Sequence, residues 1–200
     1  MWKLRASIRC VLYRFGMRKL PVATLALVVL LLAGCVPQGS PATPVPSPSL
    51  APVFASEDAA LAAATAAYAE YELAVDHALS SFNVSGLEKV AFGEALEAAI
   101  SSVDDFKSKS QKQTGLSTVD TVTLVQASSV LGQSSISDPV QIYACLDISK
   151  TDVLKPDGSS VIPPSRQRRV PILVDLAWNV ASERLLVSAE QVWDGQDFCG

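Results

Sequence analysis

The sequence predicts an α+β domain in which N-terminal helices pack on a curved antiparallel sheet of about four strands. Residues 56–112 carry apolar side chains at helical spacing, and residues 119–192 contain four segments with the patterning of strands. The helical and strand segments follow one another without mixing, which is typical of helices packed on one face of an antiparallel sheet. The chain from Ser56 onward, about 145 residues, is long enough to bury a sizeable core.

The first helix is expected to begin after Ser56, which suits an N-cap position, and to continue through residues 59–81, which contain no Gly or Pro. Its apolar stripe recurs at helical spacing and consists of Leu61, Ala64, Tyr68, Tyr71, Val75 and Leu79. Residues 83–86 interrupt the pattern. Residues 87–112 predict a second helix, which Gly93 could split. The expected buried face of this helix consists of Leu96, Ile100, Val103 and Phe106.

Four strands are expected after Gly115, and they cover residues 119–125, 140–148, 170–178 and 184–192. The second strand alternates cleanly, and its apolar face consists of Val140, Ile142, Ala144, Leu146 and Ile148. Residues 179–183 would form the hairpin between the last two strands.

The third strand carries apolar side chains on both faces. The larger set is expected to pack on the helical stripe and consists of Val170, Ile172, Val174, Leu176 and Trp178. The smaller set, Leu173 and Ala177, would then share the outer face with Asp175. Because an exposed apolar patch usually marks an interaction site, the sequence predicts that this outer face meets a partner protein or a second copy of the chain, as in a homodimer.

Residues 1–34 differ sharply in charge from the rest of the chain. They contain six basic and no acidic side chains, whereas the remainder contains 10 basic and 20 acidic side chains, a net charge of −10. A basic start before the apolar run of residues 20–33 is the layout of an export signal. The run is shorter than the roughly 20 residues that span a membrane. Met17, followed by two basic residues, could be the true start in place of Met1.

The apolar run ends in a sequence that resembles the bacterial lipobox, Leu32-Ala33-Gly34-Cys35. The resemblance implies that Cys35 receives a diacylglyceryl group, that residues 1–34 are a lipoprotein signal peptide, and that the protein is anchored to the outer face of the cell membrane. Residues 35–55 would be the lipidated cysteine and a Pro-rich linker, followed by the α+β domain over residues 56–200. The alternative is an uncleaved signal anchor.

Two cysteines are left in the expected exported domain, because Cys10 would be removed with the signal and Cys35 would be lipidated. An even number of cysteines in an oxidising compartment favours a disulfide between Cys145 and Cys199. No close-spaced pair of metal ligands accompanies them, so no metal site is expected.

The order of helices before strands resembles the nuclear transport factor 2-like fold, also called cystatin-like, in which a curved sheet wraps a long first helix into a cone. Four segments further along the chain look like those of uncharacterised actinobacterial envelope lipoproteins. They are residues 143–147, the Pro-Asp-Gly loop at 156–158, Arg168-Arg169, and the final segment from Trp193 to Cys199. The resemblance implies a location and a fold but no known reaction.

Enzymes of this fold use an interior Asp as base and a Tyr or acid as oxyanion donor. The resemblance therefore gives a candidate pocket, which consists of Tyr68, Tyr71, Tyr143 and Asp175. Asp175 lies in an otherwise apolar strand, where a raised pKa would be expected if its face were buried. If that face is solvated, Asp175 has no such role.

The basic residues Arg166, Arg168 and Arg169 form a candidate anion patch, which could bind phosphate-rich envelope polymers or lipid head groups. The alternative is a solvated loop that leads into a strand.

The leading hypothesis is a non-enzymatic envelope lipoprotein that binds a small apolar ligand or an envelope protein. The alternatives are a small isomerase or hydratase with an interior Asp, and a module of a larger secretion or wall-assembly complex. No cofactor and no nucleic acid are expected, because neither a phosphate-binding motif nor a basic domain is present.

Overall fold

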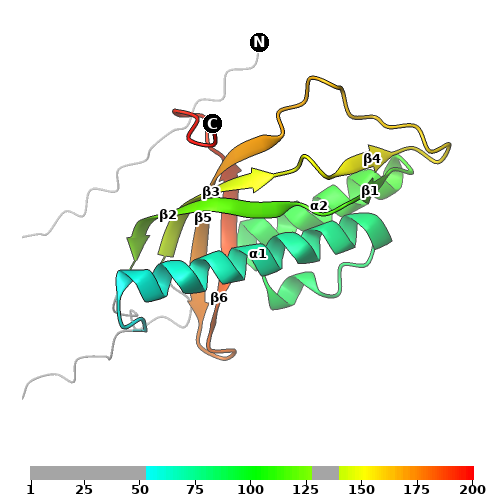
Figure 1. Cartoon of the computed structure of the whole chain (residues 1–200). Coiled ribbons are helices and arrows are strands. Elements are labelled where there is room, and N and C mark those ends of the chain that lie inside the picture. The colour runs from blue at the N-terminus through cyan, green and yellow to red at the C-terminus, as the bar shows by residue number, and fades with distance from the viewer. Residues whose placement is uncertain (1–52, 128–139) are drawn as a thin grey trace, which may run out of the picture. The chain divides into compact units, whose positions relative to one another are not determined.

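The computed structural model describes residues 53–127 and 140–200, so the expected signal peptide, Cys35 and most of the linker lie outside the described residues. Two helices, α1 (Glu57–Ser81) and α2 (Gly93–Ser108), pack against antiparallel sheets, which confirms the predicted α+β class (Figure 1). Within the described ranges, no helix is both long and apolar enough to cross a membrane.

Helix α1 begins and ends where its local sequence allows. The Ser56 side chain accepts a hydrogen bond from the backbone N–H of Ala59 at 3.1 Å, as an N-cap does. At the other end Phe82 adopts a left-handed conformation (φ 59°), and its N–H donates to the carbonyl of Ala78. This turn directs the chain toward the short 3₁₀ helix η1 (Leu87–Lys89).

The second predicted helix is interrupted, as Gly93 suggested. Between η1 and α2 the chain makes a parallel bridge from Ala91 to Val187 of the last strand. Gly93 then takes a positive φ of 56°, where a side chain would be strained. The backbone that pairs with the sheet at Ala91 cannot at the same time continue a helix, so the break follows from the sheet contact.

The main sheet has the strand order β2-β3-β5-β6, with every pair antiparallel. All four predicted strands are present, as β2 (Thr118–Ala127), β3 (Val140–Asp147), β5 (Arg169–Asn179) and β6 (Arg184–Val192). A second, two-stranded sheet was not predicted. We call it the small ribbon, and it consists of β1 (Lys112–Thr114) and β4 (Asp152–Leu154).

The core lies between α1 and one face of the main sheet, which α1 crosses in Figure 1. Tyr68 and Tyr71 from the predicted stripe are 0% and 1% exposed, and they share this core with Val174 and Leu176 of β5. The prediction that the larger apolar set of β5 faces the helices is therefore confirmed. A smaller cluster joins the two helices and η1, and its buried members are Ala78, Leu79, Leu87, Ala99 and Val103.

The C-terminal tail, residues 193–200, folds back on the outer face of the sheet. Cys145 of β3 and Cys199 form the predicted disulfide, with their Cα atoms 5.6 Å apart. Trp193 and Phe198 pack on Tyr143 of β3, with ring centroids 5.0 and 5.3 Å from it. The disulfide thus closes the tail over the strand next to β5.

The prediction of an exposed apolar patch on the outer face was wrong. Leu173 is 9% exposed and Ala177 is fully buried. Leu173 lies directly across from Tyr143 in the β3–β5 register, and Tyr143 is the residue on which the tail packs. Sequence patterning could not show the tail packed on Tyr143, because the tail lacks a regular period.

Candidate functional site

Two tyrosines of α1 and a glutamate of β6 form a hydrogen-bonded cluster inside the domain. The hydroxyls of Tyr68 and Tyr71 donate to the two carboxylate oxygens of Glu190, each at 3.2 Å. The Tyr71 hydroxyl also lies 3.4 Å from the carbonyl oxygen of Ala95 in α2. The two rings are stacked with centroids 6.1 Å apart. Glu190 as a residue is exposed, but its carboxylate points inward against the buried phenols.

Glu72 brings a second carboxyl group to the same cluster. It is 6% exposed and lies next to Tyr71 on α1. Burial raises the pKa of Glu72 well above its usual range, and the charge of Glu190 raises it further, against the opposing effect of a hydrogen bond from Tyr68. Burial also raises the pKa of Glu190, although hydrogen bonds from the two tyrosines oppose this. Their mutual hydrogen bond raises the pKa of Glu72 and lowers that of Glu190, so Glu72 is the proton donor of the pair and Glu190 the acceptor.

Burial and the two neighbouring carboxyl groups also raise the pKa of both phenols. The tyrosines therefore remain protonated donors. The two carboxyl groups of the cluster can hold one proton between them. Both carboxylate oxygens of Glu190 already accept a hydrogen bond from a tyrosine hydroxyl.

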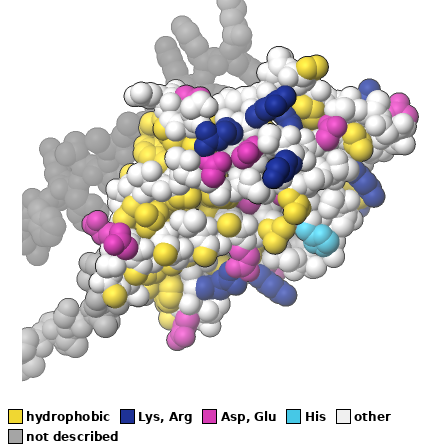
Figure 2. Space-filling view, viewed as in Figure 1, with side chains coloured by type: hydrophobic (Ala, Val, Ile, Leu, Met, Phe, Trp, Pro, Cys, Tyr) yellow, Lys and Arg dark blue, Asp and Glu magenta, His cyan; other side chains and the backbone are white. Residues whose placement is uncertain are grey.

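Asp76, one helical turn after Glu72, fastens α1 to the chain after β1. It is 4% exposed, and its carboxylate accepts from the backbone N–H of Ser117 at 2.7 Å and from the Ser117 hydroxyl at 2.8 Å. The side-chain amide of Gln113 also donates to it. Asp76 is therefore a fully engaged structural carboxylate. Its neighbour His77, the only histidine of the chain, is exposed (Figure 2).

The predicted pocket does not form as a unit. Tyr68 and Tyr71 are together in the core, but Tyr143 and Asp175 lie on the opposite face of the sheet. Tyr143 packs on the tail, and Asp175 accepts a hydrogen bond at 2.6 Å from the side-chain amide of Gln141 on the neighbouring strand. Asp175 thus lies on the outer face, where the alternation of the third strand placed it, and Tyr143 lies there too, because side chains of a strand alternate and their neighbours Ala144 and Val174 occupy the core.

The predicted anion patch is divided between two places. Arg169 turns toward β2, where it pairs with Asp120 at 2.5 Å and donates to the carbonyl of Cys199 in the tail. This contact holds the pKa of the Asp120 carboxyl below its usual value. Arg166 and Arg168 instead line a surface depression of about 390 Å³. The prediction of a common site was wrong for Arg169.

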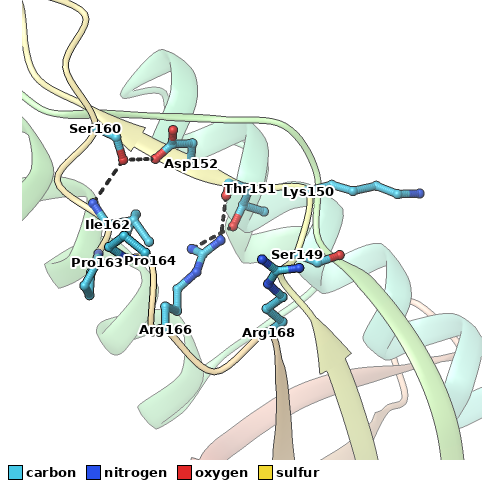
Figure 3. Close-up of a pocket in the computed structure, with 10 residues that line it drawn as sticks. All are labelled: Ser149, Lys150, Thr151, Asp152, Ser160, Ile162, Pro163, Pro164, Arg166 and Arg168. Atoms are coloured by element: carbon cyan, nitrogen blue, oxygen red, sulfur yellow. Dashed lines mark hydrogen bonds between the residues drawn. The ribbon is translucent and has the colours of Figure 1, made fainter.

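We call this depression the polar hollow (Figure 3). Its wall consists of Ser149, Lys150, Thr151, Asp152, Ser160, Ile162, Pro163, Pro164, Arg166 and Arg168. Arg166 donates to the carbonyls of Ile148 and Thr151 at 2.8 and 2.7 Å, so it fixes the turn between β3 and β4. The only carboxylate of the wall, Asp152, accepts from the Ser160 hydroxyl at 2.5 Å.

Arg168 differs from Arg166 in having no partner for its guanidinium among the described residues. It is exposed and lies beside Ser149 in Figure 3, while Lys150 extends outward from the same turn. Lys150 acts on Asp147 through its charge alone. The hollow therefore presents two unpaired cations and several hydroxyl groups, a donor set that suits a phosphate or carboxylate.

Comparisons with known proteins assign no family. The sequence matches no family model and no curated protein. Among solved structures, the intermembrane space region of the chloroplast protein ARC6 superposes with a TM-score of 0.47 at 9% identity, over 66% of this chain and 95% of that one. A structure from Catenulispora acidiphila superposes with a TM-score of 0.40 at 15% identity, over 67% of this chain and 93% of that one. Similarities this weak carry no argument about function.

Sequence reasoning missed Glu72 and Glu190 for different reasons. Glu72 had a signal, because it lies four residues after Tyr68 and so belongs to the buried stripe. Glu190 had none. Simple alternation from Val187 would place it on the outer face, but a bulge in β6 between Val187 and Ala189 shifts the register by one residue. The Ser188 hydroxyl, in the bulge, donates to the carbonyl of Asp175 at 3.0 Å.

Proposed function

We propose that the protein is an extracytoplasmic lipoprotein, anchored through Cys35, whose domain binds an anionic component of the cell envelope at the polar hollow. The observation that carries the binding role is the pair of unpaired cations, Lys150 and Arg168, beside the hydroxyls of the hollow. The envelope location is supported by the basic, apolar and lipobox segments that precede the described residues. A phosphate-rich polymer fits the hollow best, because guanidinium groups and hydroxyls bind phosphate oxygens.

The enzymatic alternative has less support. An isomerase or hydratase of this fold would use an interior Asp, but Asp175 lies on the outer face. The interior carboxyl groups of Glu72 and Glu190 are surrounded by the packed rings of Tyr68 and Tyr71. Both tyrosine hydroxyls are committed to Glu190, so neither is a free donor for a substrate oxyanion.

The experiment is a titration of the purified protein with soluble short-chain polyphosphate, followed calorimetrically. We expect binding that weakens as salt is added, since charge attraction between exposed groups is screened. Arg168→Ala should weaken binding by about tenfold, as expected for loss of a charge-assisted hydrogen bond. Lys89→Ala removes an exposed charge from η1, outside the hollow, and should leave binding unchanged. Absence of polyphosphate binding, or equal effects of the two substitutions, would contradict the proposal.

A further inference from the structure

A second depression, of about 430 Å³, differs in character from the polar hollow. Its wall consists of Phe82, Lys107, Ser110, Lys112, Thr114, Leu154, Lys155 and Pro156. The depression lies where the end of α1, the end of α2 and the small ribbon meet. Its walls are mostly apolar, and we call it the lysine-rimmed groove.

The three lysines of this groove form no ion pair among the described residues. Lys112 places its ammonium group 5.3 Å from the centre of the Phe82 ring, a cation–π contact at the rim. Lys107 and Lys155 form no ion pair within the described part of the chain, and Lys155 affects Asp157 only through its charge. Three cations around one apolar groove are notable in a chain whose residues after position 34 carry a net charge of −10.

The chemistry of the walls restricts what the groove can hold. Phe82, Leu154 and Pro156 offer apolar surface, and the long lysine side chains extend apolar stems below their charged ends. An alkyl chain can be buried against such walls without hydrogen-bond partners. A peptide in the same place would bury amide N–H groups, for which the hydroxyls of Ser110 and Thr114 are the only side-chain acceptors of this wall.

We propose that the lysine-rimmed groove binds an anionic phospholipid, with an alkyl chain against Phe82 and Leu154 and the negative head group among the three lysines. The proposed Cys35 anchor would keep membrane lipid within reach, so in this respect the inference rests on the proposed function. It does not depend on the polar hollow. The groove would give the domain a second attachment to the membrane and would orient it there.

The test places a photoreactive benzoylphenylalanine at Thr114 in the full mature protein, reconstituted with vesicles of phosphatidylglycerol or of phosphatidylcholine. Thr114 is exposed and lines the groove, whereas Ser102, on the exposed side of α2, serves as the control position. Mass spectrometry after irradiation should show a phosphatidylglycerol adduct at position 114 and little or none at position 102. Phosphatidylcholine should give a much smaller yield.

Charge reversal distinguishes binding in the groove from a general electrostatic attraction of the protein to the membrane. Lys107→Glu combined with Lys155→Glu should lower the adduct yield at position 114 by about tenfold, in keeping with the attraction of two lysines to anionic lipid. Lys89→Glu, with the charge change outside the groove, should not. Equal adduct yields at positions 114 and 102, or a yield at position 114 that the double reversal does not change, would overturn the proposal. A protein adduct at position 114 in intact cells would overturn it in favour of a protein partner. Fatty-acid labelling at Cys35 tests the anchor separately.

Discussion

At the scale of single residues, the least expected feature is the placement of Glu72. A carboxyl group that is 6% exposed would cost stability if ionised without compensation. Here burial raises the pKa of Glu72, and its hydrogen bond with Glu190 favours the protonated form of Glu72. A protonated carboxyl group can be accommodated in the apolar stripe, but the stability of the fold then depends on pH.

The sign of that dependence follows from the raised pKa of Glu72. In the unfolded chain this group loses its proton near its ordinary pKa of 4.5, whereas the folded protein retains the proton to higher pH. The stability contributed by the protonated form is thus complete at low pH and is lost as the pH rises toward the raised value, by at most about 1.4 kcal/mol per pH unit.

Glu72→Gln should therefore stabilise the protein at pH 7.5 by about 1–2 kcal/mol and have little effect near pH 4.5, because glutamine resembles the protonated acid. Thermal unfolding followed by circular dichroism at both values would measure it. Glu97→Gln, on the exposed side of α2, is the matched control and should show no such gain at either pH. A variant that is less stable than the wild type at pH 7.5 would show that the ionised form of Glu72 is the favoured one.

At the scale of elements, the helices and strands that the sequence predicted are the long ones. The long helix and the four strands of the main sheet have at least eight residues each, enough for an apolar repeat or a run of apolar and β-branched residues to predict them. The strands of the small ribbon have three residues each, too few to show a period. They pair through distant contacts, such as Gln113 with Val153, which local sequence does not encode.

The candidate site was harder to predict than the fold, because it too depends on contacts between distant parts of the chain. Tyr68 and Tyr71 follow from helical spacing, but Glu190 reaches them only through the bulge at Ser188. A shift by one residue exchanges the faces of a strand, so every assignment after an unforeseen bulge is reversed. Arg168 and Lys150 meet around a turn whose shape depends on the carbonyl contacts of Arg166.

The disulfide makes the tail part of the sheet. Cys145 and Cys199 are 54 residues apart in sequence, and closing a loop of this length stabilises the folded state by about 4 kcal/mol in the chain-entropy model. Replacing both cysteines by Ala should lower the free energy of unfolding by about 2–4 kcal/mol, measured by urea denaturation. Reductant should destabilise the wild type and leave the double variant unchanged. Equal stability of the two proteins without reductant would contradict a stabilising role for this bond.

Release of the tail should have a second consequence for the outer face. The aromatic contacts of Trp193 and Phe198 with Tyr143 would loosen, and Leu173, next to Tyr143, would lose cover. Association through the outer face is therefore expected only when the tail is freed. Leu173→Asp, which places a charge at a buried position, should now destabilise the domain.

At the scale of the whole molecule, positive charge is concentrated around the small ribbon. After residue 34 the chain has ten basic side chains. Three of them, Lys150, Arg166 and Arg168, line the polar hollow. Three others, Lys107, Lys112 and Lys155, line the groove. Six of ten cations therefore border two depressions of an otherwise acidic domain, which is the distribution expected of a protein that works against an anionic surface.

Such a role requires that the domain be held at the membrane, and the proposed holding point is Cys35. Because two acyl chains give stable attachment where one gives only marginal binding, a diacylated Cys35 should keep the protein in the membrane fraction. Cells grown with radiolabelled fatty acid should yield labelled protein there. Cys35→Ala should abolish the label and leave unprocessed precursor. Cys10→Ala, in the segment that processing removes, should leave label and fractionation unchanged. Label that persists in Cys35→Ala, or that disappears in Cys10→Ala, would show that Cys35 is not the acylated residue, and the basic depressions would then need another route to their ligands.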